Sequence, residues 1–314
     1  MPAVNAAVVT SYDEPPHYLP FDLPDADDHD HELVDVVAVG LHPRVRSGAS
    51  GSHYTSTGVL PLVPGIDGVA RRKDGSLVYF VADDELTGPM AEQTVVDVRR
   101  TVPLPPGADV HRVAAAMNPA MSSWVALRRR ISFQPGQSVL VLGASGNAGA
   151  MAVQVAQHLG AGRVVAAGRS LDRLAELGAD EVVPLADPDA LGAAAGDVDV
   201  VIDYLWGAPA ERAMVALLTA RPDRSKALDW IQIGSIAGPD ITLPSALLRA
   251  ANLRILGNGQ GAVSTRGYLA ELPGLVDEID RGTFRITARA VPLSDVEAIW
   301  LQPDTPGERI VLTP

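Results

Sequence analysis

The run of residues 138–149 holds the residue types and spacing that most clearly indicate a chemistry. An apolar stretch, residues 139–142, leads into a glycine-rich turn that ends at Gly149, and a segment rich in alanine and valine follows at helical spacing. In a strand, turn and helix of this kind, glycines let backbone N–H groups approach a pyrophosphate at the positive end of the helix. The run therefore predicts a cradle for a dinucleotide.

The residues after the next apolar strand indicate which dinucleotide. That strand, residues 163–167, is followed by Gly168, Arg169 and Ser170. An NAD-binding chain places Asp or Glu there, on the ribose 2′-hydroxyl. Arg169, with Arg173 near it, suits a 2′-phosphate instead, so the expected cofactor is NADPH. The competing interpretation is a tight turn in an ordinary α/β protein, which the two features together disfavour.

The elements around this run predict an α/β protein in two parts. Before about residue 115 the chain has short strand-like stretches separated by Pro and Gly, at residues 3–10, 33–39, 68–70, 77–81 and 93–98. Short helices are expected at 113–117 and 124–127. Six apolar strands then alternate with helices, which predicts a doubly wound parallel sheet with its ligand at the carboxyl ends of the strands; they are residues 139–142, 163–167, 181–185, 198–203, 230–233 and 254–257. A helix at 268–281 and closing strands that end at 308–312 are expected to return to the β-rich part.

Composition excludes several classes of partner and site. A chain of 314 residues is long enough for two domains. Its net charge of −13 makes nucleic acid and anionic membranes unlikely partners. The absence of cysteine removes disulfides, thiolate nucleophiles and cysteine-rich zinc sites. No stretch approaches the roughly 20 apolar residues of a spanning helix, so the expected location is the cytoplasm.

Short motifs in a specific order cover nearly the whole chain. They are residues 39–43, 64–68, 88–92, 121–124, the turn itself, 177–180, 199–203 and 310–312. With these motifs the chain resembles the medium-chain dehydrogenase/reductases, and among them the zinc-independent NADPH:quinone oxidoreductase-like branch. It departs from the family at the turn, where Ala144 stands at the first glycine position and Asn147 replaces a common glycine.

The resemblance implies a fold, a cofactor site and an assembly. A GroES-like substrate domain would comprise residues 1–117 and 261–314, a Rossmann domain residues 118–260, and hydride would pass in the cleft between them. A homodimer would form through the last Rossmann strand, residues 252–257, whose exposed edge pairing would cover. The residues expected to bind NADPH are Asn118, Ser122, Ser145, Gly146, Asn147, Ala148, Gly149, Gly168, Arg169, Ser170, Arg173, Leu205, Gly234, Ser235 and Gly259.

No zinc site is expected. Zinc-dependent relatives hold their metal with a Cys, a His and a further Cys, and the matching positions here are His42, Ile66 and Asn118. One possible ligand out of three cannot build a tetrahedral site. The acidic run at residues 25–32 contains two histidines and could bind a cation, but we expect it to be a solvated connection between strands.

The catalytic groups are less defined than the cofactor site. Hydride transfer needs an acceptor stacked on the nicotinamide and a group that stabilises charge on the acceptor oxygen. By resemblance, His42 or Tyr54 could donate to that oxygen, and each could equally be a packing residue. Asn118 and Ser122 are expected to orient the nicotinamide. No tyrosine precedes a lysine by four residues, which excludes the short-chain reductase arrangement.

The expected activity is reduction of quinones or of α,β-unsaturated carbonyls by NADPH without a metal. The alternatives are a relative of zinc alcohol dehydrogenases, a non-catalytic NADPH-binding sensor or structural protein, and, more distantly, a nucleotide-binding transferase. Turnover with a quinone would separate the first interpretation from the sensor.

Overall fold

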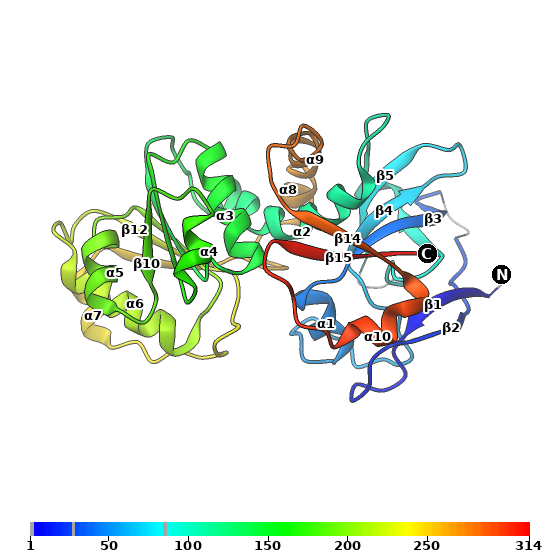
Figure 1. Cartoon of the computed structure of the whole chain (residues 1–314), viewed down its shortest axis with the longest axis horizontal. Coiled ribbons are helices and arrows are strands. Elements are labelled where there is room, and N and C mark those ends of the chain that lie inside the picture. The colour runs from blue at the N-terminus through cyan, green and yellow to red at the C-terminus, as the bar shows by residue number, and fades with distance from the viewer. Residues whose placement is uncertain (1–2, 27–28, 84–86) are drawn as a thin grey trace. The chain divides into compact units, whose positions relative to one another are not determined.

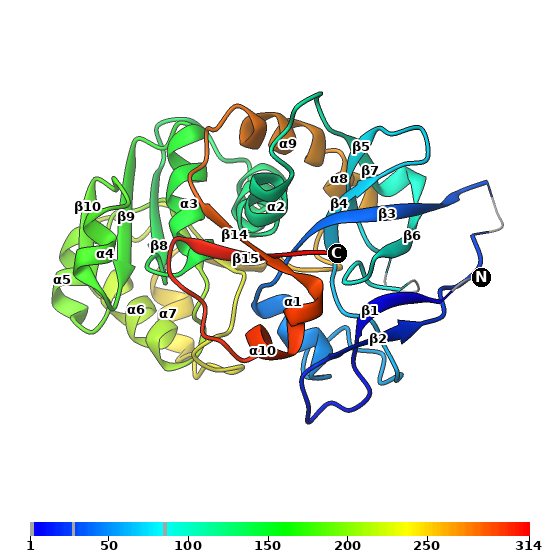
Figure 2. The same cartoon turned by 45° about the vertical axis from the view of Figure 1, so that its right-hand side comes forward.

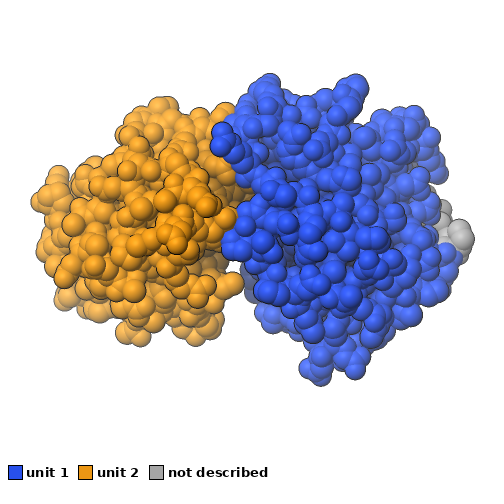
Figure 3. All heavy atoms as spheres, viewed as in Figure 1, with its two compact units in different colours: residues 1–118, 272–314 blue, residues 119–271 orange. Residues whose placement is uncertain are grey.

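The computed structural model describes residues 3–26, 29–83 and 87–314. The chain forms two compact units, coloured separately in Figure 3: unit 1 is Met1–Asn118 with Leu272–Pro314, and unit 2 is Pro119–Glu271. The second boundary lies after residue 271, whereas the sequence suggested 260. The segment between these residues belongs to unit 2 because the Ala262 carbonyl accepts from Arg130 and the Glu271 carboxylate accepts from the Trp124 indole.

Unit 2 contains a six-stranded sheet in which every pairing is parallel, in the order β10-β9-β8-β11-β12-β13 (Figure 1). All six strands expected from the sequence are present, with ends that differ by up to two residues, and the α/β class is confirmed. Their bounds are β8 Ser138–Leu142, β9 Arg163–Gly168, β10 Glu181–Pro184, β11 Val200–Asp203, β12 Leu228–Gln232 and β13 Leu253–Gly257.

Helices cover both faces of this sheet, because its central strands are apolar on both sides. Figure 1 shows α5 and α6 on one face and α3 and α4 on the other. The core includes Leu140, Leu142 and Trp230, all fully buried. The helices of unit 2 are α3 Asn147–His158, α4 Leu171–Ala175, α5 Pro188–Ala195, α6 Gly207–Ala220, α7 Ser245–Ala250 and α8 Thr265–Leu269.

The prediction of two short helices before residue 135 is wrong. A single helix, α2 (Val110–Val125), continues through Pro119 and ends in a π-helical turn, Ala126–Arg130. Proline removes one backbone donor, but Met117 and Ala120 on either side are completely buried, and their packing keeps the helix intact.

The helix expected at 268–281 is also corrected, since α8 ends at Leu269 and α9 (Leu272–Asp280) begins separately. Pro273 lies in the first turn of α9, where a missing N–H costs nothing.

Unit 1 is rich in strands and joins both ends of the chain. The C-terminal strand β15 pairs antiparallel with β3 and parallel with β14, so all three lie side by side (Figures 1 and 2). Two of its strands, β2 and β7, were not expected from the sequence, because each is short and contains proline. The strands are β1 Val4–Val8, β2 His17–Phe21, β3 His31–Gly40, β4 Asp67–Arg71, β5 Leu77–Val81, β6 Gln93–Asp97, β7 Thr101–Pro103, β14 Thr287–Pro292 and β15 Glu308–Thr313.

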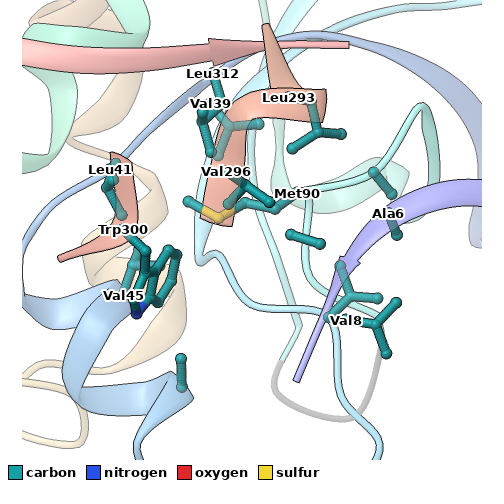
Figure 4. Close-up of a cluster of buried hydrophobic side chains, with 14 of the residues drawn as sticks. Ala6, Val8, Val39, Leu41, Val45, Met90, Leu293, Val296, Trp300 and Leu312 are labelled. Atoms are coloured by element: carbon teal, nitrogen blue, oxygen red, sulfur yellow. The ribbon is translucent and has the colours of Figure 1, made fainter. Parts of the chain in front are cut away.

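The core of unit 1 is assembled from segments far apart in the sequence. Trp300 of α10 (Val296–Trp300) packs in one apolar cluster with Val45 of α1 (Pro43–Ala49) and with Leu41 (Figure 4). Leu312 of β15 is part of the same cluster. This packing holds β3 and Leu41, and therefore His42 two residues after the strand, in a fixed place.

Candidate functional site

The glycine turn after β8 has a backbone that only glycine can supply at two points. Gly143 has φ +85°, in the left-handed region. At Gly149 a Cβ would lie 2.3 Å from the Gly143 carbonyl oxygen, so α3 packs directly on the turn. Gly146 precedes the helix and provides no side-chain cap, which leaves the first turn of α3 suited to an anion. Asn147, Ala148 and Gly149 form that first turn.

The end of β9 lies against this turn. The Ala167 carbonyl accepts hydrogen bonds from the N–H groups of Gly143 and Ala144, at 2.9 and 3.0 Å. A Cβ on Gly168 would be 3.0 Å from the Ser145 hydroxyl. Ser145 also accepts a hydrogen bond, through its carbonyl, from Arg173 Nε at 3.2 Å. The structure thus brings the expected pyrophosphate and ribose residues together within unit 2.

Arg169 and Arg173 differ in their surroundings. Arg169 follows β9 directly and is exposed, as is Ser170 beside it. Arg173, on α4, is partly buried and also lies 3.8 Å from the Glu176 carboxylate. Arg169 is therefore the arginine that can turn toward a ligand at the end of β9, while Arg173 supports the turn.

A second group of expected residues gathers around Tyr204, which directly follows β11. The Tyr204 and Ser122 hydroxyls are 2.8 Å apart. Gly234 packs against Tyr204, because a Cβ there would be 2.7 Å from the Tyr204 carbonyl oxygen. Burial raises the pKa of Tyr204 to about 12, so its hydroxyl stays protonated. Tyr204 was not among the expected site residues, although its place at the carboxyl end of a central strand could have indicated it.

Asn118, Gly259 and Ser235, the other residues expected in this region, lie near the hydrogen bonds made by Ser122 and Asn258 or by their own backbone. Asn118 is one helical turn before Ser122 on α2. Gly259 follows Asn258, whose amide donates to the Ser122 carbonyl at 2.9 Å. Ser235 accepts, through its carbonyl, the N–H of Gly238 at 3.2 Å. Ser122 is thus the centre of a hydrogen-bonded group.

Asp203, at the end of β11, fixes the chain that follows it. Its carboxylate accepts the N–H groups of Leu205 and Trp206 at 2.8 and 3.1 Å and the Trp230 indole at 3.0 Å. Burial raises the pKa of Asp203, and these three donors oppose that shift. Trp206 has φ 51°, a strained conformation for a non-glycine residue. Leu205 is thereby held against Gly143, whose Cβ would be 2.9 Å from its side chain.

The two candidate catalytic residues lie in unit 1 in contrasting environments. His42 is 1% exposed, and its Nε2 is 3.5 Å from Asp67 Oδ1. The Asp67 carboxylate also accepts the Tyr79 hydroxyl at 2.9 Å. Burial lowers the pKa of His42 despite the nearby carboxylate, so the ring is neutral at pH 7. Tyr54 is 70% exposed.

A neutral imidazole has a single N–H donor, and the nearest carboxylate, that of Asp67, lies beside Nε2 at 3.5 Å without a hydrogen bond between them. The carboxylate beside Nε2 favours the tautomer with its hydrogen on Nε2, which leaves Nδ1 as an acceptor. His42 in this state does not donate to another oxygen through Nδ1. Of the two candidates, Tyr54 has the solvent-accessible hydroxyl.

No family model matches the chain. A probable NADPH-dependent quinone reductase of Emericella nidulans is 30% identical to it, in an alignment that covers 99% of this chain and 100% of that protein. The chain belongs to the quinone oxidoreductase-like branch of the medium-chain dehydrogenase/reductases. The resemblance inferred from the sequence motifs is thereby confirmed.

Other members of this branch are similar to the chain as well. The quinone oxidoreductase from Thermus thermophilus, whose structure is known also in complex with NADPH, aligns with a TM-score of 0.83 and 25% identity over 99% of this chain and 100% of that one. A chloroplastic NADPH-dependent alkenal/one oxidoreductase of Arabidopsis thaliana is 31% identical over 48% of this chain and 44% of that protein.

The positions that hold zinc in other medium-chain dehydrogenase/reductases are His42, Ile66 and Asn118 in this chain. Ile66 has no donor atom, and His42 is paired with Asp67. Within residues 3–26, 29–83 and 87–314, no group of three or more His, Cys, Asp and Glu residues could hold a metal ion.

In the acidic run at residues 25–32, Asp30 and Glu32 form ion pairs with Arg99 and Arg72, at 3.0 and 2.6 Å. Asp27 and Asp28 lie outside the described residues. None of the helices in the described part of the chain is both long and apolar enough to cross a bilayer.

Proposed function

We propose that this protein is an NADPH-dependent reductase of quinones or α,β-unsaturated carbonyls that works without a metal, in the cytoplasm. The glycine turn with Arg169 at the end of the adjacent strand carries the proposal. The names of the relatives support it, since they describe NADPH-dependent quinone and alkenal/one reductases. The alcohol dehydrogenase and sensor alternatives gain no support from those names.

The residues of unit 2 fit the cofactor. The space that Gly146 leaves open lets the backbone approach a pyrophosphate, and Gly149 lets α3 begin close behind it. Arg169 and Ser170 would hold the 2′-phosphate, since a guanidinium forms charge-assisted pairs with phosphate oxygens. Ser122, fixed by Tyr204, would orient the nicotinamide together with Asn118, which belongs to unit 1 and lies on the same helix, α2. The bound NADPH supplies the hydride.

The remaining chemistry requires little of the protein. We assign to the Tyr54 hydroxyl the role of donor to the acceptor oxygen, and to His42 a supporting role inside unit 1. A quinone or enone spreads the developing charge over a conjugated system, so one neutral donor is enough. A simple ketone concentrates that charge on one oxygen and needs a Lewis acid or a stronger donor.

A panel of acceptors tests this proposal. We expect NADPH oxidation with quinones and enones, little reaction with simple ketones, and no effect of a chelator on the rate. Rapid NADP-dependent oxidation of simple alcohols with no quinone or enone reduction would support the alcohol dehydrogenase alternative. Cofactor binding with no turnover of any acceptor would support the sensor.

We expect the protein to bind NADPH more tightly than NADH, and Arg169→Ala to remove the difference. The lost pair contributes roughly 1.5 to 3 kcal/mol, which corresponds to about ten- to a hundredfold in affinity. Titration of both cofactors into the wild type and the variant measures this. Arg224→Ala, which removes another exposed arginine of unit 2, is the matched control and should change neither affinity. Equal affinities in the wild type would refute the assignment.

We also propose a homodimer that forms through β13. This strand is one edge of the parallel sheet and contains no proline, whereas the opposite edge, β10, ends in Pro184. Proline blocks pairing at an edge, so β13 is the edge open to a partner. Sedimentation should show a dimer at micromolar concentration, a monomer for Ile255→Pro, and a dimer for the control Val182→Pro. A monomeric wild type, or a dimer of Ile255→Pro, would contradict the proposal.

A further inference from the structure

Unit 2 has an open cavity of about 440 Å³ at the amino ends of its strands. Four arginines line it: Arg128, Arg129 and Arg130 from the π-helical turn that ends α2, and Arg254 from β13. We call it the arginine cavity. π-Helical turns are rare in proteins, and those that occur are often found at functional sites. This one contains three consecutive arginines.

Gln137, Asp229 and Arg254 place the arginine cavity at the amino ends of the strands, opposite the glycine turn, and only the Arg130 guanidinium extends to the carboxyl end of β13, where it binds the Gly257 carbonyl. Gln137, in its lining, directly precedes β8, and Gly143 directly follows that strand. Six residue steps in an extended chain correspond to roughly 20 Å. A ligand in the arginine cavity is therefore separate from a cofactor at the turn.

The surrounding protein holds each guanidinium in place through part of its donor set. Arg128 Nε and Arg129 Nε each lie 2.5 Å from a different oxygen of Glu271. Although burial opposes ionisation, these two arginines keep the pKa of Glu271 below its ordinary value. Arg130 donates to two carbonyls, those of Gly257 and Ala262, both at 2.8 Å.

The fourth arginine is held across the sheet. Arg254 on β13 is the register partner of Asp229 on β12, and their side chains form a two-point ion pair at 2.5 and 2.6 Å. A guanidinium has five N–H donors, and the bonds described here engage one or two on each arginine. The arginines are thus both fixed in position and able to bind more acceptor atoms.

The charge of the arginine cavity contrasts with that of the chain. Four arginines face one lining carboxylate, Asp229, and the cluster stays positive when Glu271 is included. The chain as a whole carries a net charge of −13, which repels anions from most of its surface. Side chains around the cavity are almost all polar, so an apolar ligand gains nothing there. Planar guanidinium groups match the oxygens of phosphates and carboxylates.

We propose that the arginine cavity binds a small polyvalent oxyanion, a phosphorylated or polycarboxylate metabolite, at a site independent of the cofactor. Its ligand would bridge the π-helical turn at the end of α2 and Arg254 of β13. The helix α2 also contains Ser122, which we propose orients the nicotinamide, so the same helix connects this site to the cofactor site.

Calorimetric titration of the NADPH-saturated protein with inorganic pyrophosphate and, separately, with citrate tests the proposal. We expect one anion per chain, with binding weakened about tenfold or more by Arg129→Gln. Glu271 keeps Arg128 as a partner in this variant, so the fold should survive. Arg129→Lys retains the charge and should bind with intermediate affinity, and the control Arg224→Gln should bind as the wild type does.

The two probes also distinguish the ligand classes. Tighter binding of pyrophosphate indicates a phosphorylated ligand, and tighter binding of citrate a polycarboxylate; either outcome supports the site. Anion binding that is seen without NADPH and is lost when the protein is saturated with NADPH belongs to the glycine turn. If all binding is of that kind, if neither anion binds at millimolar concentration, or if Arg129→Gln binds as the wild type does, the proposal is wrong.

Discussion

Gly146→Ala should weaken NADPH binding by at least about tenfold, or ~1.4 kcal/mol, while the melting temperature stays unchanged. A Cβ at residue 146 would lie 3.5 Å from the Gly143 carbonyl oxygen, an ordinary contact, so the turn itself tolerates a methyl group. The methyl group would occupy the space through which the backbone approaches the pyrophosphate. Fluorescence titration with NADPH and a thermal melt of the same sample measure the two effects.

Gly149→Ala is the matched variant with the opposite pattern. Its Cβ would lie 2.3 Å from the Gly143 carbonyl oxygen and 2.7 Å from the Ala144 Cα, both backbone atoms that cannot give way easily. Overpacking of this kind costs about 1–3 kcal/mol of folding stability. The melting temperature should therefore fall. If Gly146→Ala binds NADPH as tightly as the wild type, the pyrophosphate does not lie at this turn.

The second large effect concerns Tyr54 and His42, which should respond differently to substitution. Tyr54→Phe removes only an exposed hydroxyl, so turnover should fall roughly ten- to a thousandfold with no change in melting temperature. His42→Ala leaves the Asp67 carboxylate without its imidazole neighbour in a buried site, which costs on the order of 1–3 kcal/mol. The assay is quinone reduction at saturating NADPH, beside a thermal melt of each variant. Unchanged turnover of Tyr54→Phe would contradict the role assigned to its hydroxyl.

The pH dependence of stability tests the buried role of His42 separately. Its folded pKa lies below the ordinary value of 6.5, so the unfolded chain takes up a proton that the folded chain resists. The wild type therefore loses stability as the pH falls below about 6.5, and His42→Ala lacks this contribution. The stability difference between the two proteins should be larger at neutral than at acidic pH. A difference that grows on acidification would show that His42 is charged in the folded protein.

Much of the fold could be predicted because its signals are local. The six apolar strands of unit 2 and the glycine turn are read from hydrophobic runs and from Gly143 to Gly149. The continuous helix through Pro119 could not be predicted, because proline usually ends a helix and only the tertiary burial of its neighbours overrides that preference. Strands β2 and β7 were missed for a related reason, since their pairing partners rather than their own residues make them strands.

The candidate site divides in the same way. Ser145 to Gly149, Gly168 and Arg173 are brought together by one strand-turn-helix unit and its neighbour, which sequence spacing encodes. The hydroxyls of Tyr204 and Ser122 are in contact although the two residues are more than 80 positions apart in the sequence. No local sequence pattern predicts such a pair. The pairing of His42 with Asp67 depends on β3 and β4 lying adjacent in unit 1. The consequence for the tautomer of His42 follows only from that geometry.

The most direct measurement follows the hydrogen itself. The protein is incubated with a conjugated enone and NADPH that carries deuterium at C4 of the nicotinamide, and the product is analysed by mass spectrometry and NMR. The proposed function predicts a saturated ketone with deuterium on the β carbon and an intact carbonyl group. Deuterium on the carbonyl carbon of an allylic alcohol, or no NADPH oxidation with either enones or quinones, would contradict it.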